Sequence, residues 1–135
     1  MSHHMNSKRR PREDLGFHCD SAHEANVARI LKYLGIEFKP YKNSKKNIDI
    51  EEMAGKLKLR NEDNDRPLKE MQPDFYVPKE DTYIEVKGGW GSFTSNDRKK
   101  LAAALLMNKK IVEICGITYT ILERAFKDKI PEWES

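Results

Sequence analysis

The stretch QPDFYVPKEDTYIEVKGGW, residues 72–90, contains an acid and a lysine on either side of one valine. Residues two apart in a strand share a face, so Glu85 and Lys87 project together while Ile84 and Val86 point to the other side. The apolar neighbours favour a buried strand. Such a pair of opposite charges is either a structural ion pair or part of a functional site, and a pair buried only for stability contributes little.

A second acid, Asp74, lies in the preceding apolar stretch, and a short PKED turn separates the two stretches. We expect them to pair as antiparallel strands, which would bring the carboxylates of Asp74 and Glu85 close together. Carboxylates that close repel each other unless a cation neutralises them, and such oxygen ligands suit Mg²⁺ or Mn²⁺ rather than zinc. Lys87 could then orient a metal-bound water or help to deprotonate it. Gly88 and Gly89 would let the backbone approach a phosphate closely.

The elements that must position these residues follow from the hydrophobic periodicity. A helix is predicted from Ser21, its N-cap, to Gly35, which stops it. Alternating or apolar stretches predict strands at 36–41, 56–60, 71–77, 82–88 and 111–116, the last of them buried. Residues 49–55 predict a helical turn, and 117–129 a final helix. A helix is also predicted over 96–108, capped by Ser95 or Asn96, with Ala102, Leu105 and Leu106 as core candidates.

The order helix, strands, helix, strand, helix predicts an α/β fold in which helices flank a mixed β-sheet. At 135 residues the chain has the length of one domain, which we place at 21–135. Residues 1–20 are basic and proline-broken, so we expect a flexible N-terminal arm, with an expression-tag remnant at 1–4.

Composition excludes several classes of protein. Charged residues make up 35% of the chain, mean hydropathy is −0.81, and no apolar run approaches the roughly 18 residues of a membrane span. We therefore expect a cytoplasmic protein of a bacterium or phage-infected cell that does not bind membranes. Cys19 and Cys115 lie far apart without metal-ligand spacing, which argues against a zinc site and against a disulfide.

Positive charge is local rather than global. Net charge is only +3, but basic residues cluster at 8–12, 41–46 and 97–100. One such run is usually a solvated face, whereas three favour a polyanionic partner.

The acid, acid, lysine set resembles the signature of the PD-(D/E)XK nuclease superfamily. The stretches SAHEANVARILKYLGI, PDFYVP, YIEVKG and IPEWE are similar to small phage and mobile-element endonucleases of that superfamily. They are similar more distantly to Holliday-junction resolvases and to the endonuclease subunits of heteromeric transposases. The resemblance covers roughly residues 21–133, with 42–70 matching least, and it implies a restriction-endonuclease-like core.

The resemblance also implies roles for individual residues. Asp74 and Glu85 become metal ligands, the Val86 carbonyl completes the coordination, and Lys87 becomes the catalytic lysine. Glu24 takes the part of a helix-borne acid that members of the superfamily often add. Ser21-x-x-Glu24 is equally a capping box, in which the glutamate bonds back to the start of its own helix.

Four further residues are candidate DNA contacts. Arg98, Lys99 and Lys100 lie at the start of a predicted helix, where phosphate contacts are common. Trp90 either stacks on a base or fills its own loop. Asp97 is expected to cap the helix or to form a salt bridge.

Together these features predict a Mg²⁺- or Mn²⁺-dependent DNA endonuclease acting on duplex, nicked or branched DNA through a metal-activated water. The alternative is a non-catalytic DNA-binding or assembly module on the same fold. A homodimer is also expected, because the last helix and the tail carry much apolar surface, namely Ile117, Ile121, Leu122, Phe126 and Trp133.

Overall fold

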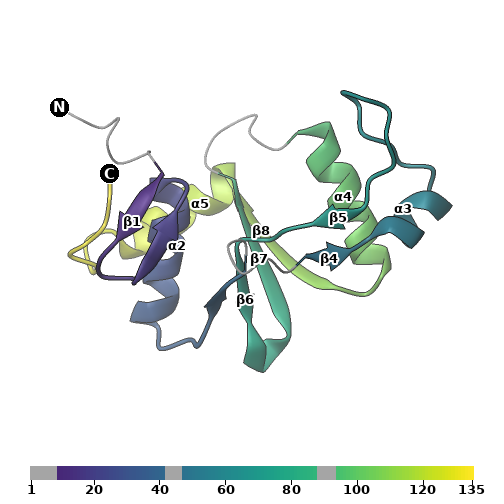
Figure 1. Cartoon of the computed structure of the whole chain (residues 1–135). Helices are drawn as coiled ribbons and strands as arrows, with labels where there is room; N and C mark the ends of the chain where they lie inside the picture. Colours follow the sequence, from purple (N-terminus) through teal and green to yellow (C-terminus); the bar gives the residue numbers. More distant parts are fainter. Residues whose placement is uncertain (1–8, 42–46, 88–93) are drawn as a thin grey trace.

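The computed structural model describes residues 9–41, 47–87 and 94–135 (Figure 1). The strands are β1 (Arg10–Arg12), β2 (Phe17–Cys19), β3 (Lys39–Pro40), β4 (Ile48–Asp49), β5 (Glu70–Met71), β6 (Phe75–Val77), β7 (Thr82–Lys87) and β8 (Lys110–Cys115). The helices are α2 (Ala22–Tyr33), α3 (Glu51–Lys56), α4 (Ser95–Leu106) and α5 (Gly116–Phe126), with a short 3-10 helix, η2, at Pro78–Glu80.

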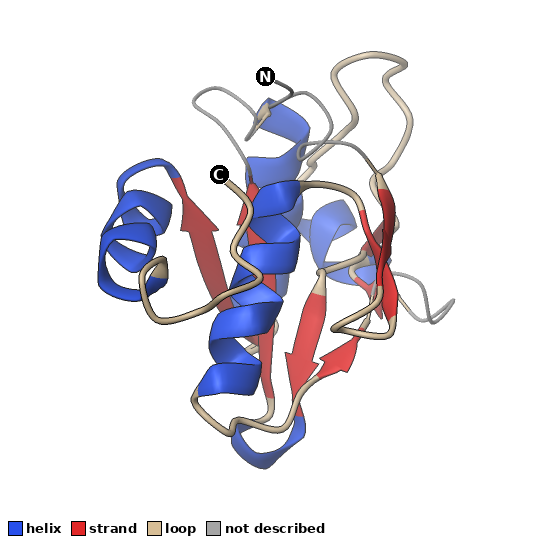
Figure 2. Cartoon of the chain, turned by 90° about the vertical axis from the view of Figure 1, so that its left-hand side faces the viewer, coloured by secondary structure: helices blue, strands red, loops and turns tan. Residues whose placement is uncertain are grey.

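The central feature is a mixed four-stranded sheet in the order β3-β6-β7-β8. The pairs β3–β6 and β6–β7 are antiparallel, whereas β7–β8 is parallel. Helices α2 and α5 pack on one face, where Phe75 and Ile84 are buried, and α3 and α4 pack on the other beside Tyr83 (Figures 1 and 2). The predicted mixed sheet flanked by helices is therefore confirmed.

Helix α2 forms as its sequence predicts. The Ser21 hydroxyl accepts a hydrogen bond from the Glu24 N–H at 3.1 Å, and Gly35 follows the helix with φ +72°, a conformation that glycine adopts without strain. Val27, Ala28 and Leu31 form the buried stripe against the sheet.

The predicted flexible arm is wrong for residues 9–20. Strands β1 and β2 form an antiparallel hairpin in which Arg10 lies opposite Cys19, and order therefore begins well before Ser21. Arg12 and Cys19 are buried in this hairpin, against expectation for a polar, proline-broken stretch. The hairpin cannot be predicted from local composition, because Glu134, which binds Arg12, lies at the other end of the chain. Residues 1–8, including the predicted tag remnant, lie outside the described residues.

One predicted strand is absent from the far face of the sheet. Residues 56–60 form no strand: Lys56 ends α3, Lys58 has φ 57°, and Arg60 makes only an isolated bridge to Pro67. The strand that pairs with β4 is instead β5, because their register buries Ile48 and Met71 together. The helical turn predicted at 49–55 is confirmed as α3.

Helix α4 begins one residue earlier than expected and turns a different face to the core. Its N-cap is Thr94, and its fully buried residues are Ala103 and Ala104. Leu105 and Leu106 are about half exposed, and Ala102 is exposed as well. Small side chains face the core because they let α4 approach α3 and β8 closely.

Strand β8 lies at the edge of the sheet, so it is less buried than its apolar sequence predicts. Ile114 packs in the core, but Val112 is 47% exposed. Exposed apolar side chains continue on α5 at Ile117 and Ile121, whereas Leu122 and Trp133 pack against the core. The homodimer stays a prediction, with its candidate surface reduced to the residues that remain exposed. None of the helices described is long and apolar enough to span a lipid bilayer.

Candidate active site

The register of β6 and β7 brings the first two predicted site residues together. Phe75 pairs with Ile84 and Tyr76 with Tyr83, and Asp74 directly precedes β6, beside Ile84 and Glu85 of β7. The Asp74 N–H donates to the Ile84 carbonyl at 3.0 Å, so the register slips by one residue at Asp74, as it does in a β-bulge. Glu85 lies two residues from Tyr83 in β7, so its carboxylate is on the α4 side of the sheet.

Asp74 is 3% exposed, and its side chain is held by the backbone of β7. Its Oδ2 atom accepts a hydrogen bond from the Val86 N–H at 2.7 Å, and its carbonyl accepts from the Tyr41 N–H at 2.9 Å. A buried carboxylate needs such donors to remain charged. These contacts fix the Asp74 carboxylate beside the peptide between Glu85 and Val86. The Val86 side chain itself packs in the core.

Lys87 ends β7 on the same face as Glu85, as the two-residue period requires. Its Nζ atom lies 3.4 Å from the Asp97 Oδ2 atom on α4, and each of these side chains is 24% exposed. The expected roles of Asp97 as a cap and as a salt-bridge residue are both confirmed, because it also caps α4 together with Thr94.

The structure adds a residue that the sequence analysis missed. Glu85 lies beside Glu113 in the parallel β7–β8 pair, so these two carboxylates share one face of the sheet. The Cys115 thiol donates to the Glu113 Oε1 atom at 3.3 Å. A glutamate inside the apolar stretch IVEIC was a signal for Glu113, but its position beside Glu85 depends on the strand order.

Burial raises the pKa of the Cys115 thiol, and the hydrogen bond to Glu113 acts in the same direction. The positive charge of Arg98 acts the other way, which places that guanidinium near the end of β8. Because Lys87 pairs with Cys115 in the ladder, Arg98 lies on the side of the site where β7 ends. Its side chain is exposed, as a phosphate contact requires.

The other predicted DNA contacts differ in their surroundings. Lys99 donates to the Arg60 carbonyl at 3.0 Å and lies 4.0 Å from Glu62, so its ammonium is engaged by the 60–62 turn. Lys100 lines a surface depression with residues of the 61–70 segment. Trp90, together with Gly88 and Gly89, lies outside the described residues.

Glu24 occupies a capping position. Its Oε2 atom accepts a hydrogen bond from the Asp20 N–H at 3.0 Å, just before the N-cap Ser21. Its side chain also lies against Cys19, whose pKa rises to about 12 because of burial and then the nearby Glu24 charge. Within residues 9–41, 47–87 and 94–135, no three His, Cys, Asp or Glu side chains gather closely enough to hold a metal ion. Glu24 is therefore not brought together with Asp74 and Glu85 in this structure.

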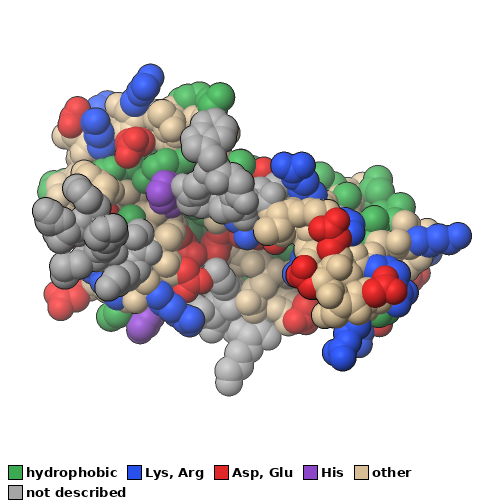
Figure 3. Space-filling model, turned by 90° about the horizontal axis from the view of Figure 1, so that it is seen from above, with side chains coloured by type: hydrophobic (Ala, Val, Ile, Leu, Met, Phe, Trp, Pro, Cys, Tyr) green, Lys and Arg blue, Asp and Glu red, His purple; other side chains and the backbone are tan. Residues whose placement is uncertain are grey.

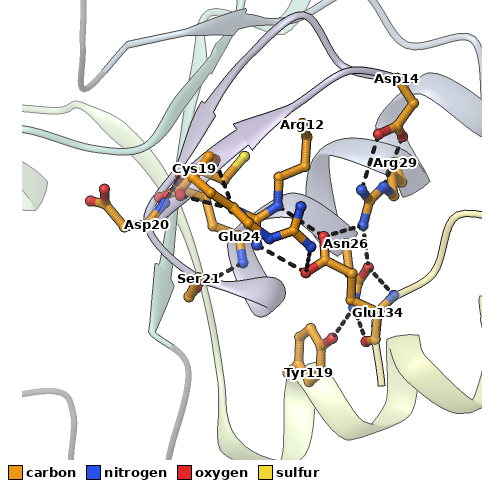
Figure 4. Close-up of polar contacts among 11 residues, drawn as sticks. Arg12, Asp14, Cys19, Asp20, Ser21, Glu24, Asn26, Arg29, Tyr119 and Glu134 are labelled. Carbon is orange, nitrogen blue, oxygen red and sulfur yellow. Dashed lines mark hydrogen bonds and ion pairs between the residues drawn. The ribbon is translucent and has the colours of Figure 1, made fainter. Parts of the chain in front are cut away.

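A separate cluster of charges joins the β1–β2 hairpin, α2 and the C-terminal tail (Figure 4), at the end of the molecule away from α3 (Figure 1). Arg12, whose side chain is fully buried, donates to both carboxylate oxygens of Glu134 at 2.9 Å. Arg29 donates to Glu134 at 2.8 Å and, through two nitrogens, to Asp14 at 2.8 and 3.0 Å. Asn26 bonds the Glu134 carbonyl at 2.8 Å. These pairs tie the β1–β2 hairpin, α2 and the C-terminal tail together, which is a structural role.

Seen from above, one face of the molecule is recessed in its middle (Figure 3). In Figure 3, acidic side chains lie in the sunken middle of this face, between the end with the β1–β2 hairpin and the end with α3 and α4. A polyanion approaching this hollow would meet carboxylates on its floor and basic side chains on its margins, an arrangement that suits a divalent cation between the two anions.

The chain matches no protein-family model, no curated protein and no solved structure.

Proposed function

We propose that the protein is a metal-dependent DNA endonuclease with a restriction-endonuclease-like core. The observation that carries the proposal is the hydrogen bond from the Val86 N–H to the buried Asp74 carboxylate, which places this acid next to Glu85, with Lys87 two residues beyond Glu85 in β7. A buried acid held by the next strand, a second acid in that strand and a lysine two residues further on meet the chemical needs of phosphodiester hydrolysis.

The donor set fits a hard divalent cation. The Asp74 and Glu85 carboxylates and the Val86 carbonyl would hold Mg²⁺ or Mn²⁺, because all three offer oxygen atoms and two of them carry charge. When bound there, the ion would supply a Lewis acid that activates water and stabilises charge on the phosphate. The hydrogen bond from the Val86 N–H keeps the Asp74 carboxylate in one orientation.

The protein's own basic side chains would bind the substrate. The Lys87 ammonium sits at the margin of the acidic face, where it can bind a phosphate oxygen or orient the attacking water. Arg98 at the start of α4 would bind the DNA backbone without reading its sequence. Duplex, nicked and branched DNA all offer such phosphates.

Plasmid and branched DNA incubated with the protein test this proposal. Cleavage is expected with Mg²⁺ or Mn²⁺ and not with excess EDTA, because carboxylates cannot activate water at neutral pH without the ion. Full cleavage in EDTA would refute the metal mechanism. DNA binding without cleavage under any metal would favour the non-catalytic binding or assembly module.

The same assay bears on the homodimer. One site attacks one strand, so paired cuts need two sites related by two-fold symmetry. Linear plasmid together with a dimer in sedimentation would support paired cutting. A monomer that leaves only nicked circles would identify a nicking enzyme.

A further inference from the structure

In the first turn of α4, the Asp97 carboxylate takes part in both a helix cap and an ion pair. The Asp97 N–H donates to the Thr94 hydroxyl at 3.2 Å, and the Thr94 N–H donates to the Asp97 Oδ2 atom at 3.0 Å, which completes a reciprocal capping box. The same Oδ2 atom lies 3.4 Å from the Lys87 Nζ atom. One side chain therefore joins the start of α4 to the end of β7.

The Asp97 carboxylate is held as an anion. Partial burial acts to raise its pKa, but the hydrogen bonds from Thr94 and the positive charge of Lys87 outweigh burial, so the pKa lies below its ordinary value. A lysine side chain has four rotatable bonds and is costly to order by itself. An anion fixed by a helix cap supplies a defined partner for it.

We propose that Asp97 is a positioning residue that holds the Lys87 ammonium beside the Asp74 and Glu85 carboxylates. The catalytic consequence rests on the proposed nuclease function, whereas the placement of Lys87 does not. Asp97 itself does not touch the reacting atoms. It keeps the Lys87 side chain directed along the face on which Glu85 lies, so that the ammonium meets the phosphate without first losing conformational freedom.

The competing interpretation is an ordinary half-exposed salt bridge beside a helix cap. Such pairs contribute little to stability and nothing to turnover. The two interpretations differ in what happens when the charge is removed and the cap is kept.

Asp97→Asn makes that change, because the amide oxygen still accepts the Thr94 N–H but no longer attracts the ammonium. We expect kcat for plasmid cleavage to fall by up to about 100-fold, the loss that misplacing a reacting group can cause. KM for DNA and the melting temperature should stay near those of the wild type. Asp97→Glu keeps both charge and cap, since glutamate is common at this position of a capping box, and should restore most of kcat.

Thr94→Ala is the matched control. It removes the hydroxyl from the cap and leaves the Asp97 charge, so it should lower the melting temperature by a few degrees and preserve kcat below that temperature. An Asp97→Asn variant with wild-type kcat, or a Thr94→Ala variant with the same loss of kcat as Asp97→Asn, would overturn the proposal.

A second measurement does not depend on nuclease activity. Acylation of Lys87 by an amine-reactive reagent, followed by mass spectrometry of the peptide, reports how firmly its ammonium is held. We expect labelling to be several-fold faster in Asp97→Asn than in the wild type and unchanged in Thr94→Ala. Equal labelling in all three would refute the positioning role. If labelling is faster in Asp97→Asn but the wild-type protein cuts no DNA, the positioning role of Asp97 is kept and the proposed nuclease function is refuted.

Discussion

Two groups of charged side chains lie on opposite sides of the sheet, and they differ in how their charges are balanced. In the cluster between the β1–β2 hairpin, α2 and the C-terminal tail, Arg12 and Arg29 donate bidentate or shared hydrogen bonds to Glu134 and Asp14. Most of these bonds are buried. Towards the ends of β7 and β8, Glu85 and Glu113 lie side by side on one face, and Lys87 is paired with Asp97 from α4.

We interpret the first group as structural, and the proposed nuclease function assigns the second group to catalysis. A buried network in which cations and anions match is rigid and has no need of an external partner. Like charges gathered at a hollowed surface repel one another, and a cation relieves that repulsion. Removing a charge should therefore have opposite consequences in the two groups, mainly loss of folding in the first and mainly loss of turnover in the second.

The largest effect is expected at the acidic face. Asp74→Asn keeps an acceptor for the Val86 N–H, and Glu85→Gln keeps the shape of its side chain, but each removes a charge that the metal ion needs. Cleavage should fall by about 10³-fold or more, because the ion contributes several kcal/mol to the transition state. Melting temperature should hold or rise. Either variant cutting at the wild-type rate would show that the site is misplaced.

Glu134→Gln should have the reverse outcome. It leaves two buried guanidinium groups facing a neutral amide, and losing one partner of a buried ion pair costs about 3–5 kcal/mol of unfolding free energy. Urea unfolding measures this loss. Glu132→Gln, an exposed change two residues earlier, is the control and should stay within about 0.5 kcal/mol. Cleavage per folded molecule should be unchanged in both variants.

Low pH should destabilise the fold through the same network of Arg12, Arg29, Asp14 and Glu134. Burial acts to raise the pKa of Glu134, but the hydrogen bonds and charges of Arg12 and Arg29 bring it below its ordinary value of 4.5. The Arg29 hydrogen bonds likewise lower the pKa of Asp14 below 3.8. A lowered carboxyl pKa adds stability that is complete above the unfolded value and is lost as pH falls through the folded value.

We therefore expect the free energy of unfolding to be level near neutral pH and to decline as pH falls below about 4.5. Glu134→Gln should show a smaller decline over the same range, because one of the two linked carboxyls is absent. An equally steep decline in the variant would assign the acid sensitivity to other carboxyls. Chemical unfolding at a series of pH values measures both slopes.

The smallest effect is expected at Glu24. In the structure its carboxylate accepts the Asp20 N–H at the start of α2, so Glu24→Gln keeps most of its hydrogen bonding. Activity and melting temperature should both survive. Ser21→Ala, which removes the hydroxyl that caps the same turn, should cost about 1 kcal/mol. A Glu24→Gln variant that loses cleavage while its melting temperature holds would instead make Glu24 a part of the metal site.

The sequence alone determined the local arrangement of the site. The two-residue period of a strand puts Glu85 and Lys87 on one face, and the short connection through η2 makes β6 and β7 neighbours, so Asp74 had to fall near Glu85. Helix α2 and both of its ends were equally readable, since a serine cap and a glycine stop act within a few residues. These features depend on interactions between residues close in the chain.

Only the tertiary structure decided the rest. Glu113 neighbours Glu85 because β8 returns parallel to β7 after α4, and Lys87 meets Asp97 because α4 packs on that face through Ala103 and Ala104. Arg12 bonds to Glu134, 122 positions away in sequence. This contact holds the β1–β2 hairpin in place where the sequence predicted a flexible arm. Polar partners and edge positions of this kind depend on which surfaces meet during folding, because local periodicity gives the direction of a side chain and not the identity of its neighbour.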